Sequence, residues 1–167
     1  MTLQPFPAAS ERASMYPIET PIETRPDEQR RRPQLVLLVE DEPFVREATG
    51  SILESAGFEV LTATDADHAL KVYQASPRPI DLVMTDMILP GRTGRQLGDE
   101  LRQRCPNLAV LITSGYSQAE CSVEAPQSRT YFLAKPYSRR GLIAKIEQIF
   151  LLPSRALPLY HASGKVG

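Results

Sequence analysis

The sequence has little net charge, few cysteines and no long apolar run. Its 167 residues carry a net charge of −1, which gives the chain no general attraction to nucleic acid or to an anionic membrane surface. Apolar runs such as Leu35–Val39 are far shorter than the roughly 20 residues of a membrane-spanning helix. The N-terminus has no apolar segment of signal-peptide type, so we expect a cytoplasmic protein without a membrane partner.

Cys105 and Cys121 are the two cysteines of the chain. They lack the second pair, or the neighbouring histidines, that a zinc site requires. A disulfide between them is not expected in a reducing compartment. We interpret both as packing or surface residues.

The composition changes toward both ends of the chain. The first 33 residues hold six of the 15 prolines and show no apolar periodicity, so we expect a disordered N-terminal tail there. Residues 153–167 are interrupted by prolines and are expected to form a C-terminal tail, too short for a DNA-binding or catalytic output domain. Residues 34–152 remain as a single domain.

Within residues 34–152 the pattern alternates between strands and helices. The segment 34–39 is almost entirely apolar, which suits a strand buried on both faces. Pro43 fits the first turn of a following helix, and Gly57 is expected to end that helix. Its apolar stripe is predicted at Val45, Ala48, Ile52 and Ala56. Five such strands, alternating with helices, predict an α/β fold with a mainly parallel sheet and helices on both faces.

Polar residues stand at the carboxyl ends of four predicted strands. They are Glu40 with Asp41, Asp86, Ser114 and Lys135. The carboxyl ends of parallel strands share one edge of the sheet, where ligands bind. Carboxylate oxygens are the ligands that Mg²⁺ prefers, and a cation would offset the repulsion between neighbouring acids. A metal ion, a lysine and a hydroxyl around one carboxylate are the parts needed for phosphoryl transfer, and Asp86, beside the tight turn "LPGRTG", is the candidate nucleophile.

These motifs resemble the receiver domain of two-component response regulators. The resemblance covers about residues 35 to 151 and rests on "ED", "DLVMTDMILPGRTG", "LITSGYS" and "FLAKPYS", in that order. It implies a flavodoxin-like, doubly wound (βα)5 fold with a five-stranded parallel sheet of order 2-1-3-4-5. It also implies a phosphoprotein of signal transduction or of a phosphorelay rather than an enzyme, with weak self-phosphorylation and dephosphorylation at most.

The resemblance further implies a role for each site residue. Asp86 would accept a phosphoryl group from a histidine kinase or a histidine phosphotransfer protein, and Lys135 would pair with that group. The ligands of Mg²⁺ would be Glu40, Asp41, Asp86 and the backbone carbonyl of Ile88. The switch residues would be Ser114, Tyr116 and Phe132, although Phe132 lacks the hydroxyl of the tyrosine that is common there. The segment 115–130, poor in large apolar residues, is predicted to become ordered on activation and to help present a surface to a downstream protein partner.

Two other functions remain open on the sequence. The first is a pseudo-receiver, a binding scaffold that is never phosphorylated, although such a scaffold has no need to keep like charges together. The second is a Mg²⁺-dependent phosphohydrolase of the haloacid-dehalogenase type. Ile88 stands two residues after Asp86, where the "DxDxT" signature of that class has its second acid. The phosphohydrolase is therefore disfavoured.

Overall fold

The computed structural model of the chain describes residues 32–115 and 129–152. Most of the two predicted tails, Cys121, Tyr116 and the greater part of the predicted switch segment lie outside these ranges, and the expectations for them stay predictions. Within the described ranges, the helices are all too short or too polar to cross a membrane.

The described residues form a parallel α/β fold. The strands are β1 (Leu35–Val39), β2 (Glu59–Ala63), β3 (Leu82–Asp86), β4 (Ala109–Ser114) and β5 (Thr130–Ala134). The helices are α2 (Pro43–Ser55), α3 (Ala66–Ala75), α4 (Gly94–Arg104) and α5 (Arg139–Leu151). All paired strands are parallel, in the order β2-β1-β3-β4-β5. The predicted fold class and strand order are confirmed.

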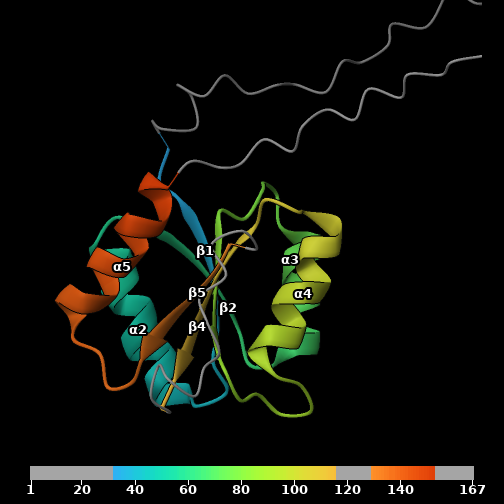
Figure 1. Cartoon of the computed structure of the whole chain (residues 1–167), viewed down its shortest axis with the longest axis horizontal. Helices are drawn as coiled ribbons and strands as arrows, with labels where there is room; N and C mark the ends of the chain where they lie inside the picture. The colour runs from blue at the N-terminus through green and yellow to red at the C-terminus, as the bar shows by residue number, and fades with distance from the viewer. Residues whose placement is uncertain (1–31, 116–128, 153–167) are drawn as a thin grey trace, which may run out of the picture. The chain divides into compact units, whose positions relative to one another are not determined.

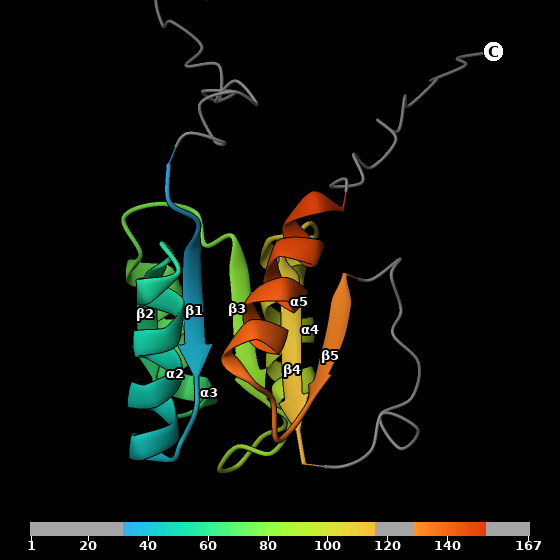
Figure 2. The same ribbon diagram turned by 90° about the vertical axis from the view of Figure 1, so that its left-hand side faces the viewer.

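Two layers of helices cover the sheet, with α2 and α5 on one face and α3 and α4 on the other (Figures 1 and 2). The apolar run of β1 supplies both layers, because successive side chains of a strand point to opposite faces. Leu35, Leu37 and Val39 pack in the core that contains Leu97 of α4. Val36 and Leu38 pack in the core that contains Leu53 of α2 and Leu142 of α5. The prediction of a strand buried on both faces is confirmed.

Side-chain caps fix the points at which three helices begin. Thr93 and Gln96 form a reciprocal capping box at the start of α4, and the Ser138 hydroxyl accepts the Gly141 N–H at the start of α5. Asp65 caps α3 by accepting the His68 N–H at 2.8 Å, and this hydrogen bond is the main reason that the pKa of Asp65 is lowered. Each cap satisfies backbone donors that the first turn of a helix leaves unpaired.

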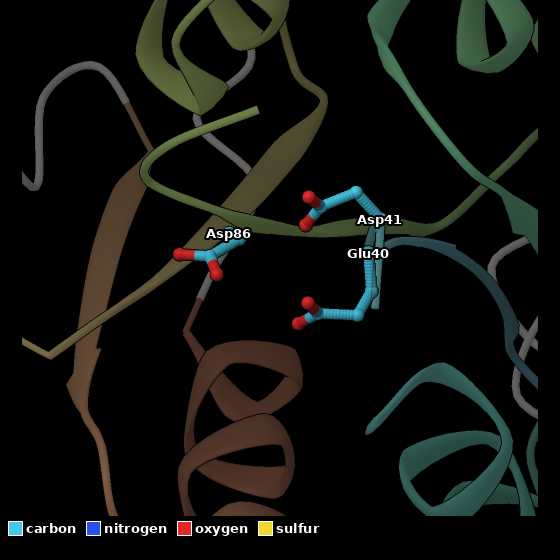
Figure 3. A group of neighbouring side chains, drawn as sticks. All are labelled: Glu40, Asp41 and Asp86. Carbon is cyan, nitrogen blue, oxygen red and sulfur yellow. The ribbon is translucent and has the colours of Figure 1, made fainter. Parts of the chain in front are cut away.

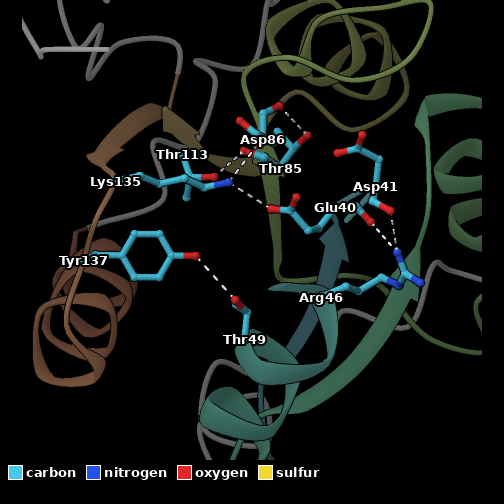
Figure 4. A network of polar contacts seen from close by, with 9 residues as sticks. All are labelled: Glu40, Asp41, Arg46, Thr49, Thr85, Asp86, Thr113, Lys135 and Tyr137. Carbon is cyan, nitrogen blue, oxygen red and sulfur yellow. Dashed lines mark hydrogen bonds and ion pairs between the residues drawn. The ribbon is translucent and has the colours of Figure 1, made fainter. Parts of the chain in front are cut away.

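The predicted apolar stripe of α2 is wrong in part. The helix begins at Pro43 and is followed by Gly57 in a left-handed conformation, as expected. Its buried residues are instead Thr49, Gly50 and Leu53, whereas Ala48 and Ala56 are exposed. The Thr49 hydroxyl lies 3.4 Å from the hydroxyl of Tyr137 (Figure 4). The helix therefore turns a partly polar face toward the chain that leads into α5.

Candidate metal-binding site

The carboxyl ends of the central strands meet at one edge of the sheet and bring three acids together. Glu40 and Asp41 follow β1, and Asp86 is the last residue of β3. Figure 3 shows the Glu40 and Asp41 carboxylates extending toward the side where Asp86 lies, and one carboxylate oxygen of each of the three acids lies within 4.8 Å of the others. At this spacing, a single cation can contact all three carboxylates.

The three acids differ in their exposure to solvent. Glu40 is only 4% exposed, whereas the Asp86 side chain is 21% exposed and Asp41 is exposed to solvent. A buried carboxylate is costly unless a cation or hydrogen-bond donors compensate it. Glu40 therefore requires a permanent partner, and Asp86 remains accessible to a reactant from solution.

Lys135 provides that partner from the end of β5. Its Nζ lies 3.0 Å from Oε2 of Glu40 and 2.8 Å from Oδ2 of Asp86 (Figure 4). Burial of the ammonium group favours its neutral form, but the hydrogen bonds and charges of Asp86 and Glu40 outweigh burial, so the pKa of Lys135 is raised. Lys135 is consequently a fixed positive charge between two acids of the cluster.

Backbone pairing fixes Lys135 and Asp86 relative to each other through β4. The N–H of Lys135 donates to the Ser114 carbonyl at 2.7 Å, and the N–H of Met87 donates to the Thr113 carbonyl at 2.8 Å. Ser114 is 3% exposed and ends β4 at this same edge, as the sequence analysis expected. The peptide bond between Lys135 and Pro136 is cis.

The loop between β3 and α4 carries Ile88. The Gly94 N–H donates to the Met87 carbonyl at 2.9 Å, and the Leu89 N–H donates to the Arg92 carbonyl at 3.1 Å. These two hydrogen bonds form the antiparallel bridge between Ile88 and Thr93, and their acceptors are the carbonyls of Met87 and Arg92. The Ile88 carbonyl accepts neither of them. Its role as a metal ligand stays a prediction.

Gly94, the first residue of α4, packs directly against β3. A Cβ atom at this position would overlap the backbone carbonyl oxygen of Asp86 and would lie 2.7 Å from Cγ2 of Thr85. Glycine is therefore what allows α4 to begin so close to Asp86. Gly50 of α2 differs, since a Cβ atom there meets no atom within 4 Å.

The same substitution at these two glycines should have opposite effects on stability. Gly94→Ala should lower the free energy of unfolding by about 1–3 kcal/mol, because the added methyl group forces backbone to move. Gly50→Ala should raise it by up to about 1 kcal/mol, because alanine favours the helix and has room. Urea denaturation of both variants measures the difference. A Gly94→Ala protein as stable as the wild type would contradict this packing of α4.

Phe132, one of the predicted switch residues, lies inside the core on the α3 and α4 face. It is 3% exposed, and Cζ of Arg95, from the first turn of α4, lies 5.7 Å from the centroid of its ring. A guanidinium at this distance attracts the face of an aromatic ring. The described conformation is thus one in which the ring is buried and covered by a cation.

The donor set of the site fits Mg²⁺. Mg²⁺ binds through a small number of carboxylate oxygens and keeps several of its waters. Glu40, Asp41 and Asp86 supply such oxygens, and the exposure of Asp41 leaves room for water. Histidine or cysteine ligands, which softer metals prefer, do not take part in this cluster of the described residues.

Two residues that shape this site, Gly94 and Arg46, were not predicted from the sequence. Arg46 donates from Nη1 to the backbone carbonyl of Glu40 at 2.7 Å and to that of Asp41 at 3.2 Å (Figure 4). The available signal was an arginine near the start of a predicted helix, four residues after the last of three consecutive acids. Gly94 offered no comparable signal, because its need for glycine arises from packing between elements.

The family model of the response regulator receiver domain matches residues 36–147. The sensor kinase CckA of Brucella abortus (strain 2308) is 31% identical over 115 residues, which are 68% of this chain and 12% of the kinase. The response regulator protein FleR of Pseudomonas aeruginosa is 37% identical over 109 residues, or 65% of this chain and 23% of FleR. The chain thus spans less than half of the length of these curated relatives.

Solved structures agree with the sequence comparison. The response regulator protein TrrA of Thermotoga maritima, in complex with Mg²⁺ and BeF, is 25% identical with a TM-score of 0.60, and the match covers 70% of this chain and 98% of TrrA. The similarity therefore extends over nearly the whole of the solved protein.

Proposed function

Because the chain belongs to the response regulator receiver domain family, we propose that Asp86 accepts a phosphoryl group in a Mg²⁺-dependent reaction. One observation carries the proposal: the Asp86 carboxylate is accessible, belongs to a cluster of three acids and contacts the ammonium of Lys135 at 2.8 Å. This combination of a nucleophile, oxygen ligands and a fixed cation is the minimum that phosphoryl transfer requires.

The chemistry of the step follows from these groups. A carboxylate oxygen of Asp86 attacks the phosphorus of a phosphohistidine, a P–O bond forms, and the P–N bond breaks with its electron pair passing to the imidazole of the donor. Mg²⁺, when bound, supplies positive charge to the oxygens of the transferring group. Glu40 and Asp41 hold the metal, and Lys135 offers its ammonium to a phosphoryl oxygen once the group is on Asp86.

We assign the conformational response to phosphorylation to Ser114 and Phe132. Ser114 lies at the edge where Asp86 ends its strand, so a small movement of β4 can bring its hydroxyl to a phosphoryl oxygen. Phe132 lies on the neighbouring strand, paired with Ile112 of β4. Movement of β4 is therefore transmitted directly to the strand that carries the aromatic ring. Tyr116 lies outside the described residues and keeps its predicted role as a switch residue.

The proposed partners follow from the family. Receiver domains interact with histidine kinases, so a histidine kinase or a histidine phosphotransfer protein is the proposed donor, and an unidentified protein is the proposed recipient of the signal or of the phosphoryl group.

The pseudo-receiver alternative differs in one respect, since it requires no chemistry at Asp86. The pairing of Lys135 with Asp86 favours a reacting site over a scaffold.

Chelation of the metal tests the proposal. The full chain, incubated with phosphoramidate and Mg²⁺, should gain the mass of one phosphoryl group, and a matched sample with EDTA in place of Mg²⁺ should gain none. The physical reason is that the single positive charge of Lys135 does not offset the repulsion between the anionic donor and three carboxylates when the divalent cation is removed. Intact-mass spectrometry measures both samples. Equal gain in EDTA and in Mg²⁺ would contradict a metal-dependent acceptor, and no gain in either would favour the scaffold.

A further inference from the structure

The turn that carries two of the three acids is bound by the side chain of Arg46. This residue lies near the start of α2, six residues after Glu40 and five after Asp41. Its Nη1 donates to both of their backbone carbonyls, at 2.7 Å and 3.2 Å, while its own N–H donates to the Glu42 carbonyl at 2.9 Å. Side chain and backbone of Arg46 together thus contact three consecutive peptide groups of the acidic turn.

Helix stability does not explain an arginine at this position. The N-terminus of a helix carries partial positive charge, so a cation in the first turn is unfavourable there. Glu42, at the N-cap of α2, makes no capping hydrogen bond with its side chain. The turn from β1 into α2 therefore depends on other contacts, and the Arg46 guanidinium is a rigid donor that can hold consecutive carbonyls.

We infer that Arg46 is a positioning residue for the metal site, holding the acidic turn so that the Glu40 and Asp41 carboxylates face Asp86. This inference rests on the proposed Mg²⁺-dependent function. Arg46 binds the backbone of both acids and leaves their carboxylate oxygens available for the metal. Without it, the two carboxylates would have to be ordered when the metal binds, and that ordering would weaken binding.

The direction of the change in Mg²⁺ affinity distinguishes a positioning role of Arg46 from an effect of its charge. Arg46 places a positive charge beside a cation site, so loss of that charge alone would tighten Mg²⁺ binding. Loss of positioning would weaken it. Arg46→Met keeps most of the apolar stem and removes both charge and donors, whereas Arg46→Lys keeps the charge and replaces the planar fork with a single ammonium group. A weaker site in both variants therefore points to positioning.

Calorimetric titration of the full chain with Mg²⁺ tests the inference. We expect the dissociation constant of Mg²⁺ to rise about tenfold in Arg46→Met, as for other residues that orient metal ligands, and to rise to a smaller extent in Arg46→Lys. In phosphorylation by phosphoramidate, the Mg²⁺ concentration for half-maximal rate should rise in both, while the rate at saturating Mg²⁺ should stay close to that of the wild type. Arg140→Met, the same change in the first turn of α5, is the matched control and should leave the Mg²⁺ affinity unchanged.

The outcomes distinguish this inference from the proposed function. Unchanged or tighter Mg²⁺ binding in Arg46→Met, beside a wild type that binds the metal, would overturn the positioning role alone. A wild type that binds no Mg²⁺ would overturn the proposed function and the inference with it. Unfolding measured in EDTA shows whether each variant is folded before titration, and Arg46→Lys provides the test if Arg46→Met does not fold.

Discussion

A chain with Asp86→Asn should gain no phosphoryl group from phosphoramidate and Mg²⁺, under conditions in which the wild type gains one. The neutral amide of asparagine lacks the anionic oxygen that attacks phosphorus, so no P–O bond can form at this position. The substitution removes one of three clustered negative charges and is nearly isosteric, so the fold should persist. Intact-mass spectrometry of both proteins measures this loss.

Asp67→Asn is the matched control for this substitution. The Asp67 side chain is 72% exposed, lies on α3 and pairs with Arg92 at 3.3 Å, and it is not one of the three clustered acids. It should gain a phosphoryl group at the wild-type rate. Phosphoryl gain by Asp86→Asn equal to that of this control would show that another residue is the acceptor.

Lys135→Met should destabilise the metal-free protein and strengthen its binding of Mg²⁺. Removal of the ammonium leaves the buried Glu40 carboxylate without its partner, and such a loss costs on the order of 3 kcal/mol. The same ammonium contacts two of the carboxylates that would hold the metal, so its removal also removes a competitor for them. Mg²⁺ should therefore restore more stability to this variant than to the wild type.

The pH dependence gives a second measure of the same ion pairs. The folded-state pKa of Lys135 is raised above its ordinary value of 10.5, so the stability that its charge contributes is complete below that value and is lost as the pH rises through the folded-state pKa. The difference in unfolding free energy between the wild type and Lys135→Met in EDTA should be constant from pH 7 to 9, within the range where the lysine is charged in both states. It should decrease only above the ordinary pKa. Equal stabilities at pH 7 would show that Lys135 does not compensate Glu40.

The sequence predicted the sheet and the edge at which the site lies, and the reasons are local. The alternation of strands and helices requires only the periods of the apolar residues, and β1 shows it clearly because both of its faces are apolar. The convergence of Glu40, Asp41 and Asp86 then follows from the geometry of a parallel sheet. The strand order was available only through the resemblance, since apolar periodicity does not say which strands are neighbours.

The features that the sequence did not predict depend on contacts between elements. The buried face of α2 includes Thr49 because that face meets Tyr137, and no pattern within the helix contains this information. Glu40 and Asp41 are adjacent acids with the same chemistry, yet one is buried beside Lys135 and the other is exposed. The need for glycine at position 94 is likewise set by how closely α4 approaches β3.

The chemical location of the phosphoryl group tests the central claim most directly. The wild-type chain, treated with phosphoramidate and Mg²⁺, is reduced with borohydride, which converts an acyl phosphate of aspartate into homoserine, and is then digested and sequenced by mass spectrometry. We predict homoserine at position 86 and unmodified aspartate at position 41, with no modification when EDTA replaces Mg²⁺. Modification at another residue, or a phosphoryl group that resists borohydride, would contradict the assignment of Asp86 as the phosphoryl acceptor.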